Sequence, residues 1–392
     1  MNFKTLIRGA AMVPLSATIA ASAQGLASGK APYDEIRIGV SQSLTGVLSP
    51  YGVSATDGIK LAAETLNARG GVNGVPIRLI IDEEGSDKNK ALANVQKHID
   101  RDLTLAEVSP TGTGLAAAVG PIANQSKIAI VGTAAGGDAR MATGSGPYSF
   151  RVSLPDNQIF PYEVKLVAKD KGAKTAALLY INDDGWGVSV APIMKKALED
   201  AGLEIIANEN YSKTTLDFSA IITKLQEKKP DIIGFLAGAE DGPQFLIQAK
   251  QRGFSSTYIG GNPFNDSAVI KRAGPAADGL IVGTSWFLGN DTPENKAFTT
   301  EFQKRYGRDA NQFNAQGYSG LGVVVDAIKR AGLTGDLKKD RIAIKEALAA
   351  TQAYASPIGP ITFDETRTPR AEAGSVIVTQ VKGGTFQRYP AK

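Results

Sequence analysis

Cysteine is absent from the 392-residue chain, and histidine occurs only once, at His98. The chain therefore has no disulfide, no thiolate nucleophile, no zinc ribbon and no cysteine for a lipid anchor. One histidine cannot form a two-histidine metal site. The polar neighbours of His98 favour a structural place on the solvent face of a helix over a role as a catalytic base. These absences exclude most metal-dependent and thiol-dependent enzymes, and we expect neither a cofactor nor a metal ion.

A strong excess of charge of either sign is also absent. Lys and Arg number 43 and Asp and Glu number 39, which gives a net charge of +4, and the basic residues are spread along the chain. Nucleic-acid-binding domains gather their basic residues in a patch or stripe. No nucleic-acid partner is therefore expected.

The first 23 residues have the order of a secretory signal peptide. Lys4 and Arg8 precede an apolar run over 10–21, which ends in the small-residue triplet Ala21-Ser22-Ala23. This run is shorter than the roughly 20 apolar residues of a membrane span. The order predicts cleavage after residue 23 and a periplasmic protein that is not lipid-anchored. A buried N-terminal helix or a membrane anchor is the alternative.

Beyond residue 34, β-branched runs alternate with amphipathic stretches, which predicts parallel strands joined by helices. The near-continuous apolar runs AALLYI and DIIGFL indicate sheets that are covered on both faces. The expected strands are 36–40, 77–82, 103–107, 128–132, 176–181, 205–208, 232–236, 258–260 and 280–284. The expected helices include 55–68, 115–124, 217–228, 294–306, 314–331 and 341–350.

These strands are too many for one sheet, and the alternating pattern restarts after residue 153. The last part of the chain holds three helices and a hairpin-like stretch over 376–389, which a simple extension of the second sheet does not explain. We therefore expect two doubly wound α/β lobes with three crossings between them that act as a hinge. The first lobe comprises 34–153 and 283–361, and the second comprises 154–282 and 362–392. A ligand cleft is expected between them, because ligands of open α/β sheets bind beyond the carboxyl ends of the strands.

The stretch Ser109-Pro110-Thr111-Gly112-Thr113-Gly114 follows an expected strand and opens an expected helix. Hydroxyl groups, glycines and free backbone N–H groups at a helix N-terminus make an anion-binding site. An ordinary glycine-rich turn with a Ser or Thr cap is the alternative. A dinucleotide site is not expected, because the next strand ends without an acidic partner for the ribose.

Other loops at strand ends are also candidates. The loop 132–137 has small residues that let backbone amides line a cleft, although a plain tight turn has the same composition. In the loop 183–187, Trp186 stands between two glycines, and we favour ligand stacking over packing within the lobe. The acidic cluster 82–84 lacks the spacing of a calcium loop, so a solvated turn is expected there.

Over residues 36–392 the chain resembles the leucine/isoleucine/valine-binding proteins, which are periplasmic receptors of branched-chain amino acid ABC transporters. The segments that carry the resemblance are IRIGVSQSLTGVLSPYG, DGIKLAAETLNARGGVNG, SPTGTG, DDGWG, DFSAIITKLQEKKPDIIGF and GPITFDE. The resemblance implies a type I periplasmic-binding-protein fold and a monomer that binds a small carboxylate ligand. It also implies that the permease subunits of an ABC transporter are its partners.

The resemblance also implies which residues bind the ligand. The loops 111–113 and 134–136 would hold the polar end of the ligand, and three aromatic side chains would line the pocket for its apolar part. The candidate residues, with two from the second lobe added, are Tyr51, Thr111, Gly112, Thr113, Ala134, Gly136, Trp186, Glu240, Asn262 and Phe313.

Two positions depart from the pattern of these receptors. Gly136 stands where a hydroxyl is usual, and Asn262 stands where an acidic residue often contacts the ammonium group of the ligand. Glu240 or Asp241 could supply the missing carboxylate. Otherwise the ligand is a carboxylate without an amine, such as an aromatic acid.

The resulting hypothesis is a receptor that performs no reaction and shifts between open and closed states when it binds a ligand. A sensor domain for a membrane signalling partner is one alternative. The other is an extracytoplasmic hydrolase that uses a pair of Asp or Glu residues in the cleft.

Overall fold

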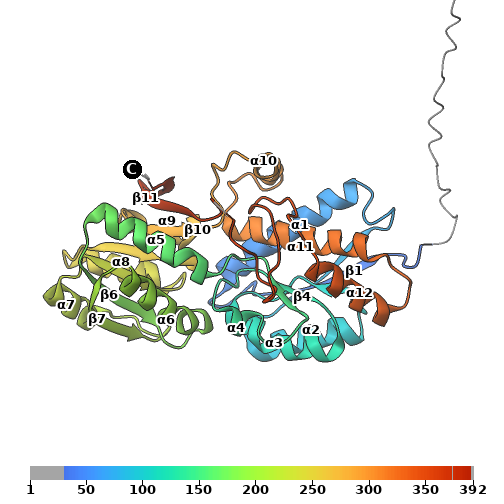
Figure 1. Ribbon diagram of the computed structural model, residues 1–392, viewed down its shortest axis with the longest axis horizontal. Coiled ribbons are helices and arrows are strands. Elements are labelled where there is room, and N and C mark those ends of the chain that lie inside the picture. The colour runs from blue at the N-terminus through green and yellow to red at the C-terminus, as the bar shows by residue number, and fades with distance from the viewer. Residues whose placement is uncertain (1–30, 373, 390–392) are drawn as a thin grey trace, which may run out of the picture. The chain divides into compact units, whose positions relative to one another are not determined.

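The structure is a computed structural model that describes residues 31–372 and 374–389. The expected signal peptide, residues 1–23, lies outside the described residues. From Pro32 onward the described residues form one unit. This unit contains two β-sheets, each at the centre of its own lobe (Figure 1).

The first lobe is built on a parallel sheet with the strand order β2-β1-β3-β4-β5. Its strands are β1 (Ile36–Gln42), β2 (Ile77–Glu83), β3 (Ala106–Glu107), β4 (Ile130–Gly132) and β5 (Ser149–Arg151). β3 is shorter than the expected 103–107, since Leu103 has a φ of 55°, which interrupts the extended backbone. β5 was not expected, because three residues are too few for a recognisable pattern.

The second lobe is built on a sheet with the strand order β12-β11-β10-β9-β8-β6-β7. Neighbouring strands are parallel, except that β11 runs antiparallel to β10 and β12 antiparallel to β11. Its strands are β6 (Thr175–Ile181), β7 (Glu204–Tyr211), β8 (Ile232–Leu236), β9 (Thr257–Gly260), β10 (Ile281–Thr284), β11 (Ile377–Lys382) and β12 (Thr385–Arg388). The expected C-terminal hairpin therefore forms one edge of the second sheet.

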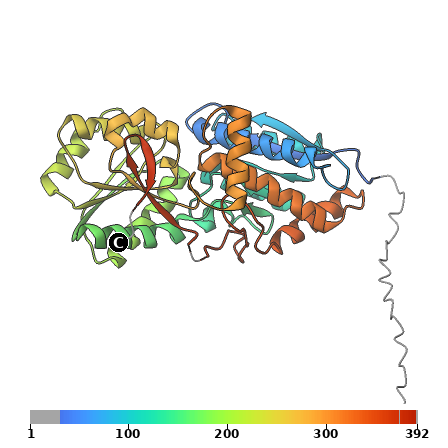
Figure 2. The ribbon, with the colours of Figure 1, turned by 90° about the horizontal axis from the view of Figure 1, so that it is seen from above.

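Helices cover both faces of each sheet (Figures 1 and 2). The first lobe contains α1 (Ser49–Ala68), α2 (Lys88–Asp100), α3 (Thr113–Ser126), α4 (Ala139–Ala142), α11 (Gln312–Ala331) and α12 (Leu337–Ala349), and α10 (Pro293–Tyr306) packs on α1. The second lobe contains α5 (Asp156–Lys171), α6 (Gly185–Asp200), α7 (Ser219–Lys228), α8 (Asp241–Gln251), α9 (Ser267–Ala273) and the short 3-10 helices Asn262–Phe264 and Gly274–Ala277. α1 begins six residues earlier than expected, because Pro50 lies in its first turn and starts the helix.

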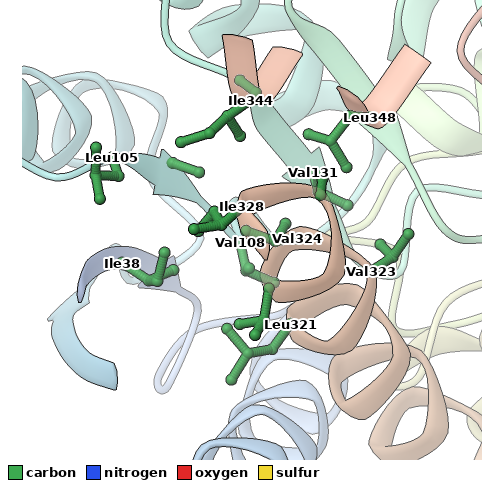
Figure 3. Close-up of a cluster of buried hydrophobic side chains, with 14 of the residues drawn as sticks. Ile38, Leu105, Val108, Val131, Leu321, Val323, Val324, Ile328, Ile344 and Leu348 are labelled. Atoms are coloured by element: carbon green, nitrogen blue, oxygen red, sulfur yellow. The ribbon is translucent and has the colours of Figure 1, made fainter. Parts of the chain in front are cut away.

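The main core of the first lobe joins distant parts of the chain, as Figure 3 shows. Ile38 of β1 and Val131 of β4 are buried in one cluster with Leu321 and Val324 of α11. Burying such aliphatic side chains stabilises the lobe by about 1.5–3 kcal/mol for each. The chain therefore returns to the first lobe after it has built most of the second, as expected.

Three segments connect the lobes, because the chain passes from one lobe to the other three times. The first lies between β5 and α5, and the second follows β10. The expected boundary between 282 and 283 divides β10, all four residues of which pair within the second sheet. The third connection lies beyond Phe363, which still packs in the first lobe, so the boundary expected after 361 is slightly early. The expected two lobes, three crossings and doubly wound sheets are confirmed.

The prediction of a solvent-exposed His98 was wrong. His98 is fully buried, and its two ring nitrogens lie 2.8 Å from Oε2 of Glu107 and 2.8 Å from Oδ2 of Asp82. Asp82 lies in β2 and Glu107 in β3, and neither lies in the helix that carries His98, so the local sequence does not reveal them. The residue is structural, but it lies in the interior of the lobe.

Candidate functional site

A cavity of about 290 Å³ lies between the two lobes, at the carboxyl ends of their parallel strands. Nine of the ten expected ligand-binding residues line it, and only Thr111 does not. The complete lining consists of Val47, Leu48, Tyr51, Ser86, Lys88, Gly112, Thr113, Gly114, Leu115, Ala134, Gly136, Ile181, Asp184, Gly185, Trp186, Lys213, Gly238, Ala239, Glu240, Asp241, Asn262, Pro263 and Phe313.

A second, larger groove of about 910 Å³ lies beside the starts of α1 and α9. It contains none of the ten expected residues. Arg308, which lines it, is paired with Asp57, with Nη2 and Oδ2 2.7 Å apart. We therefore take the smaller cavity as the site, because the strand-end loops of both lobes converge there.

The N-terminus of α3 offers hydrogen-bond donors to the cavity. Gly112, which precedes the helix, has a φ of 87°, a left-handed value that favours glycine. As the N-cap residue, Gly112 has no side chain that could cap α3. The first N–H groups of a helix have no acceptor within it, so those of Thr113, Gly114 and Leu115 are available to a ligand. The positive end of the helix dipole adds to their attraction for an anion.

Thr111 supports this loop from below instead of lining the cavity. Its hydroxyl donates to Oε1 of Gln42 over 2.6 Å and accepts from the backbone N–H of Ser43 over 3.0 Å. Its own N–H donates to Oε1 of Glu84 over 3.0 Å. The expectation that Thr111 contacts the ligand therefore does not fit its position, because all these groups already have partners within the first lobe.

Glu84 is buried beneath the same loop, and the expected solvated turn at 82–84 is wrong for this residue. Besides Thr111, the hydroxyls of Ser41 and Ser43 donate to its carboxylate over 2.9 and 3.0 Å. Burial raises the pKa of Glu84 to about 7, although these hydrogen bonds act in the opposite direction. A buried carboxyl group thus anchors the loop that carries the anion-binding donors.

The second loop of the first lobe, residues 133–137, is held by several partners. The N–H of Ala134 donates to Oε1 of Gln316 over 3.2 Å, that of Ala135 to Oγ of Ser153 over 2.9 Å, and that of Gly137 to Oγ1 of Thr113 over 3.1 Å. Within the part of the chain that the structure describes, the N–H of Gly136 has no acceptor. Gly136 is therefore the residue of this loop with a backbone donor to offer a ligand.

A carboxylate already satisfies the start of α6 in the second lobe. Asp184 precedes α6 and accepts from the N–H groups of Trp186 and Gly187 over 2.9 and 3.1 Å. At the start of α8, Asp241 accepts from the N–H of Gly238 over 3.0 Å and from the hydroxyl of Tyr211. The second lobe therefore presents the carboxylates of Asp184 and Asp241 and the ammonium group of Lys213 to the cavity, whereas the start of α3 presents backbone donors.

Aromatic side chains form the apolar part of the cavity. The rings of Tyr51 and Phe313 lie 4.8 Å apart between centroids, with an angle of 50° between their planes. Trp186 is buried, and its Nε1–H donates to Oδ2 of Asp156 over 2.6 Å. Burial, together with the nearby carboxylate of Asp241, raises the pKa of Tyr51 well above its usual value, so its phenol stays neutral.

The two remaining expected residues already have partners. The Nδ2 of Asn262 donates to Oδ1 of Asp156 over 2.8 Å, and its Oδ1 accepts from Nε2 of Gln312 over 2.8 Å. Glu240 is more than half exposed at the rim, where Nη1 of Arg272 lies 2.6 Å from its Oε2.

The described residues contain one grouping of possible metal ligands, formed by Asp82, His98 and Asp102. Lys97 neutralises it, with Nζ 2.5 Å from Asp82 Oδ2 and 3.4 Å from Asp102 Oδ2. Both nitrogens of His98 also face carboxylates. The arrangement is an internal ion-pair network of the first lobe, away from the cavity.

Residues 35–385 match the family model for the periplasmic binding protein. The chain belongs to the periplasmic binding protein family. A curated relative, the leucine-, isoleucine-, valine-, threonine- and alanine-binding protein of Pseudomonas aeruginosa, is 27% identical over 342 residues, which cover 87% of this chain and 89% of that protein. Leu/Ile/Val-binding protein homolog 3 of Brucella melitensis is 25% identical and covers 93% of this chain and 94% of its own length. The resemblance inferred from the sequence motifs is confirmed.

Solved structures of periplasmic binding proteins share this fold. The branched-chain amino acid transporter substrate-binding protein LivJ from Streptococcus pneumoniae, in complex with isoleucine, superposes with a TM-score of 0.82 at 22% identity and covers 90% of this chain and 98% of its own. A solute-binding protein from R. palustris, in complex with benzoate, has a TM-score of 0.80 at 22% identity and covers 90% of this chain and 95% of its own. At these identities the likeness extends to the fold alone.

Sequence reasoning missed several cavity residues of this periplasmic binding protein. Lys88 and Lys213 are exposed lysines of the lining, and no motif marks them. Asp184 had a detectable signal, because an Asp followed by Gly-Trp-Gly after a strand is a typical helix N-cap.

Among the described residues, no helix is long and apolar enough to span a bilayer.

Proposed function

We propose that this protein is a periplasmic receptor of an ABC transporter that closes on a small, largely apolar carboxylate and delivers it to the permease. The carboxylate binds at the N-terminus of α3, and the apolar body lies against Trp186, Tyr51 and Phe313. The protein acts as a monomer after export, without a cofactor.

The observation that carries this proposal is the contrast between the helix ends at the cavity. α3 has no side-chain cap, whereas Asp184 caps α6 with its own carboxylate. An anionic group is attracted to the free donors of α3, whereas the first N–H groups of α6 are already bound to the carboxylate of Asp184. This contrast orients a carboxylate ligand toward the first lobe, and each hydrogen bond to it contributes roughly 1.5–3 kcal/mol.

The polar groups near Gly136 and Asn262 favour a ligand without an amine. Gly136 has no side chain to accept a hydrogen bond from an ammonium group, and both ends of the Asn262 amide already have partners. An amide also lacks the charge that a buried ammonium group requires. An aromatic acid satisfies the donors of α3 and the aromatic wall together.

A hydrophobic or branched-chain amino acid is the second candidate. Asp184 and Asp241 line the cavity, and their carboxylates could accept an ammonium group. Burial raises the pKa of Asp184, and a neighbouring ammonium group would lower it again. This candidate requires a ligand that places its amine toward the second lobe.

The proposed mechanism is a shift of population between open and closed lobes, with no covalent step. Micromolar affinity corresponds to about −8 kcal/mol, which one carboxylate site and one or two buried aromatic contacts can supply. The only histidine lies away from the cavity, so it cannot act there as a base. These features support a binding role over the hydrolase alternative.

A thermal-shift screen followed by calorimetry tests the proposal. Benzoate, 4-hydroxycinnamate, leucine, valine and phenylalanine serve as probes, and we expect saturable binding of at least one acid with release of unchanged ligand. Binding of none of these probes would contradict the proposed ligand class. Turnover of a bound probe would support the hydrolase, and co-purification with a signalling kinase instead of a permease would support a sensor domain.

A further inference from the structure

Asp156 touches three cavity residues although it does not itself line the cavity. Its Oδ2 accepts from Nε1–H of Trp186 over 2.6 Å, and its Oδ1 accepts from Nδ2 of Asn262 over 2.8 Å. Its backbone N–H donates to the carbonyl of Gly136 over 2.9 Å. Trp186 and Asn262 belong to the second lobe and Gly136 to the first, so one residue connects cavity walls from both lobes.

The position of Asp156 in the chain suits such a role. It is the first residue of α5, directly after the first connection between the lobes. The side chain is fully buried. Any change in the direction of this connection therefore also changes the contacts to Gly136, Trp186 and Asn262.

We propose that Asp156 is a positioning residue of the ligand cavity, which sets the orientation of the Trp186 indole and of the Asn262 amide. This inference rests on the proposed function, which makes the cavity the ligand-binding site. Asp156 orients its neighbours because a carboxylate only accepts hydrogen bonds, so Trp186 and Asn262 must each turn a donor toward it. The indole then presents a fixed face to the cavity.

Asp156 also determines the orientation of two side-chain amides, those of Asn262 and Gln312. Since Nδ2 of Asn262 faces Asp156, its Oδ1 faces Gln312, which donates through Nε2 over 2.8 Å. Oε1 of Gln312 in turn accepts from the hydroxyl of Thr284. A donor at position 156 would reverse this order, because the Asn262 amide and then the Gln312 amide would have to flip.

The groups around Asp156 determine whether its side chain is a carboxylate that accepts hydrogen bonds. Burial raises the pKa of Asp156 to about 7, while Trp186, Arg151 and Asn262 stabilise the charged form. Arg151 is buried and donates through Nη1 to the carbonyl of Ala135 over 2.7 Å. Glu163, further along α5, is also buried, and its pKa is raised well above the usual value by burial and in part by Asp156. Between about pH 5 and 9, proton uptake by Asp156 should therefore weaken its hold on the indole.

Indole NMR on the full chain provides the test. Labelling with ¹⁵N-tryptophan gives two indole N–H signals, since the chain has two tryptophans. The signal that disappears in Trp186→Phe belongs to Trp186. We expect Asp156→Asn to move the Trp186 signal upfield. The Trp286 signal is the internal control, because its Nε1–H donates to Oδ1 of Asn295 over 2.7 Å and should not move. An unmoved Trp186 signal, or equal movement of both signals, would overturn the proposal.

Glu163→Gln is the matched control variant, because it removes a neighbouring buried carboxyl that bonds neither Trp186 nor Asn262. We expect it to leave the indole signals and the ratio of the dissociation constants for benzoate and leucine unchanged. Asp156→Asn should change that ratio roughly fivefold or more. A merely structural residue would weaken both probes equally, which would overturn the positioning role.

If Asp156→Asn does not fold, a pH titration of the wild-type protein decides the question. The Trp186 signal should move between pH 5 and 9 while the Trp286 signal stays in place, and a flat Trp186 signal would overturn the proposal. The NMR measurements need no ligand. If no probe binds but the indole responds, the proposed ligand class fails and the assignment of Asp156 stands.

Discussion

Asn262 occupies the space that a side chain at position 136 would need. A Cβ atom on Gly136 would lie 3.1 Å from Cγ of Asn262 and closer still to its Nδ2. The φ of Gly136 is outside the left-handed region, so space and not backbone conformation requires glycine there. The two departures from the pattern of the Leu/Ile/Val-binding proteins are therefore one structural feature. An amide from the second lobe fits against a bare backbone of the first.

Gly136→Ser should weaken binding of any carboxylate that the wild-type protein binds by about tenfold or more. The added side chain overlaps the amide of Asn262 and opposes closure, and overpacking of this kind costs about 1–3 kcal/mol. Calorimetric titration with benzoate and leucine measures the effect.

A compensating change serves as the control for this prediction. Asn262→Ala in the Gly136→Ser background removes the closest overlap and leaves Oδ2 of Asp156, 3.1 Å from the Cβ position, so part of the affinity should return even though the amide is lost. Wild-type affinity in the Gly136→Ser protein would mean that the two residues do not approach each other in the ligand-bound state.

Thr113→Ala should weaken ligand binding by at least about 1 kcal/mol, or roughly fivefold. Thr113 lines the cavity and its hydroxyl accepts from the N–H of Gly137, so removal of the hydroxyl disturbs both donor loops of the first lobe. Thr223→Ala is the matched control, because Thr223 is exposed on α7 and its hydroxyl donates to the carbonyl of Ser219, far from the cavity lining. Equal dissociation constants for wild type and Thr113→Ala would remove Thr113 from the site.

The sequence predicted the fold well because its signals are local. Runs such as 232–236 are apolar throughout, and buried parallel strands require this composition. The same reasoning placed the loops after β3 and β4 at the cavity, since these loops follow strands of one parallel sheet. Short strands such as β5 carry too few residues for any period to be recognised.

The sequence could not show which side chains of a loop face the ligand. Thr111 and Thr113 are two residues apart in one motif, yet the left-handed turn at Gly112 directs them to different surroundings. Glu84 and His98 look like solvated residues, because the partners that satisfy them come from other strands and loops. Hydrogen bonds between residues far apart in the sequence leave no local sequence pattern. They are the reason why the positions of Thr111, Glu84 and His98 differ from those expected.

Gly185→Ala should weaken ligand binding without lowering the free energy of unfolding. Gly185 at the start of α6 lies directly against Gly114 of α3 in the cavity lining, and a Cβ at 185 would lie 2.8 Å from Cα of Gly114. This distance is too short, so the lobes cannot close fully. Gly185 is the first residue of α6, where the exchange of Gly for Ala gains less than the roughly 1 kcal/mol of a helix interior and costs the helix nothing. Calorimetry for binding and urea denaturation for unfolding separate the two effects.

Gly114→Ala is the comparison for this prediction. A Cβ at 114 would lie 3.6 Å from Cα of Gly185, an ordinary van der Waals contact. We therefore expect a smaller loss of affinity than for Gly185→Ala. Small-angle scattering with saturating ligand should show a larger radius of gyration for Gly185→Ala only. The reverse order of the two variants would contradict the described closure contact.

His98 should make the protein more stable at acid than at alkaline pH. Burial by itself lowers the pKa of His98, but the carboxylates of Glu107 and Asp82 outweigh it and raise the pKa above the usual value. The folded state then binds the proton more tightly than the unfolded chain does. This stabilisation is complete below about pH 6.5, the unfolded value, and is lost as pH rises through the pKa of the folded state.

Two measurements check this sign. Because the chain has one histidine, the imidazole signal in an NMR titration reports the pKa of His98 directly, and we expect a value above about 6.5. Urea denaturation from pH 5 to 9 should show a larger loss of unfolding free energy for wild type than for His98→Gln. The difference between the two proteins matters, because Glu84 and Asp156, whose pKa values burial raises to about 7, add losses of the same sign to both. A pKa below the unfolded value would mean that burial outweighs both carboxylates and that the neutral imidazole is the native form.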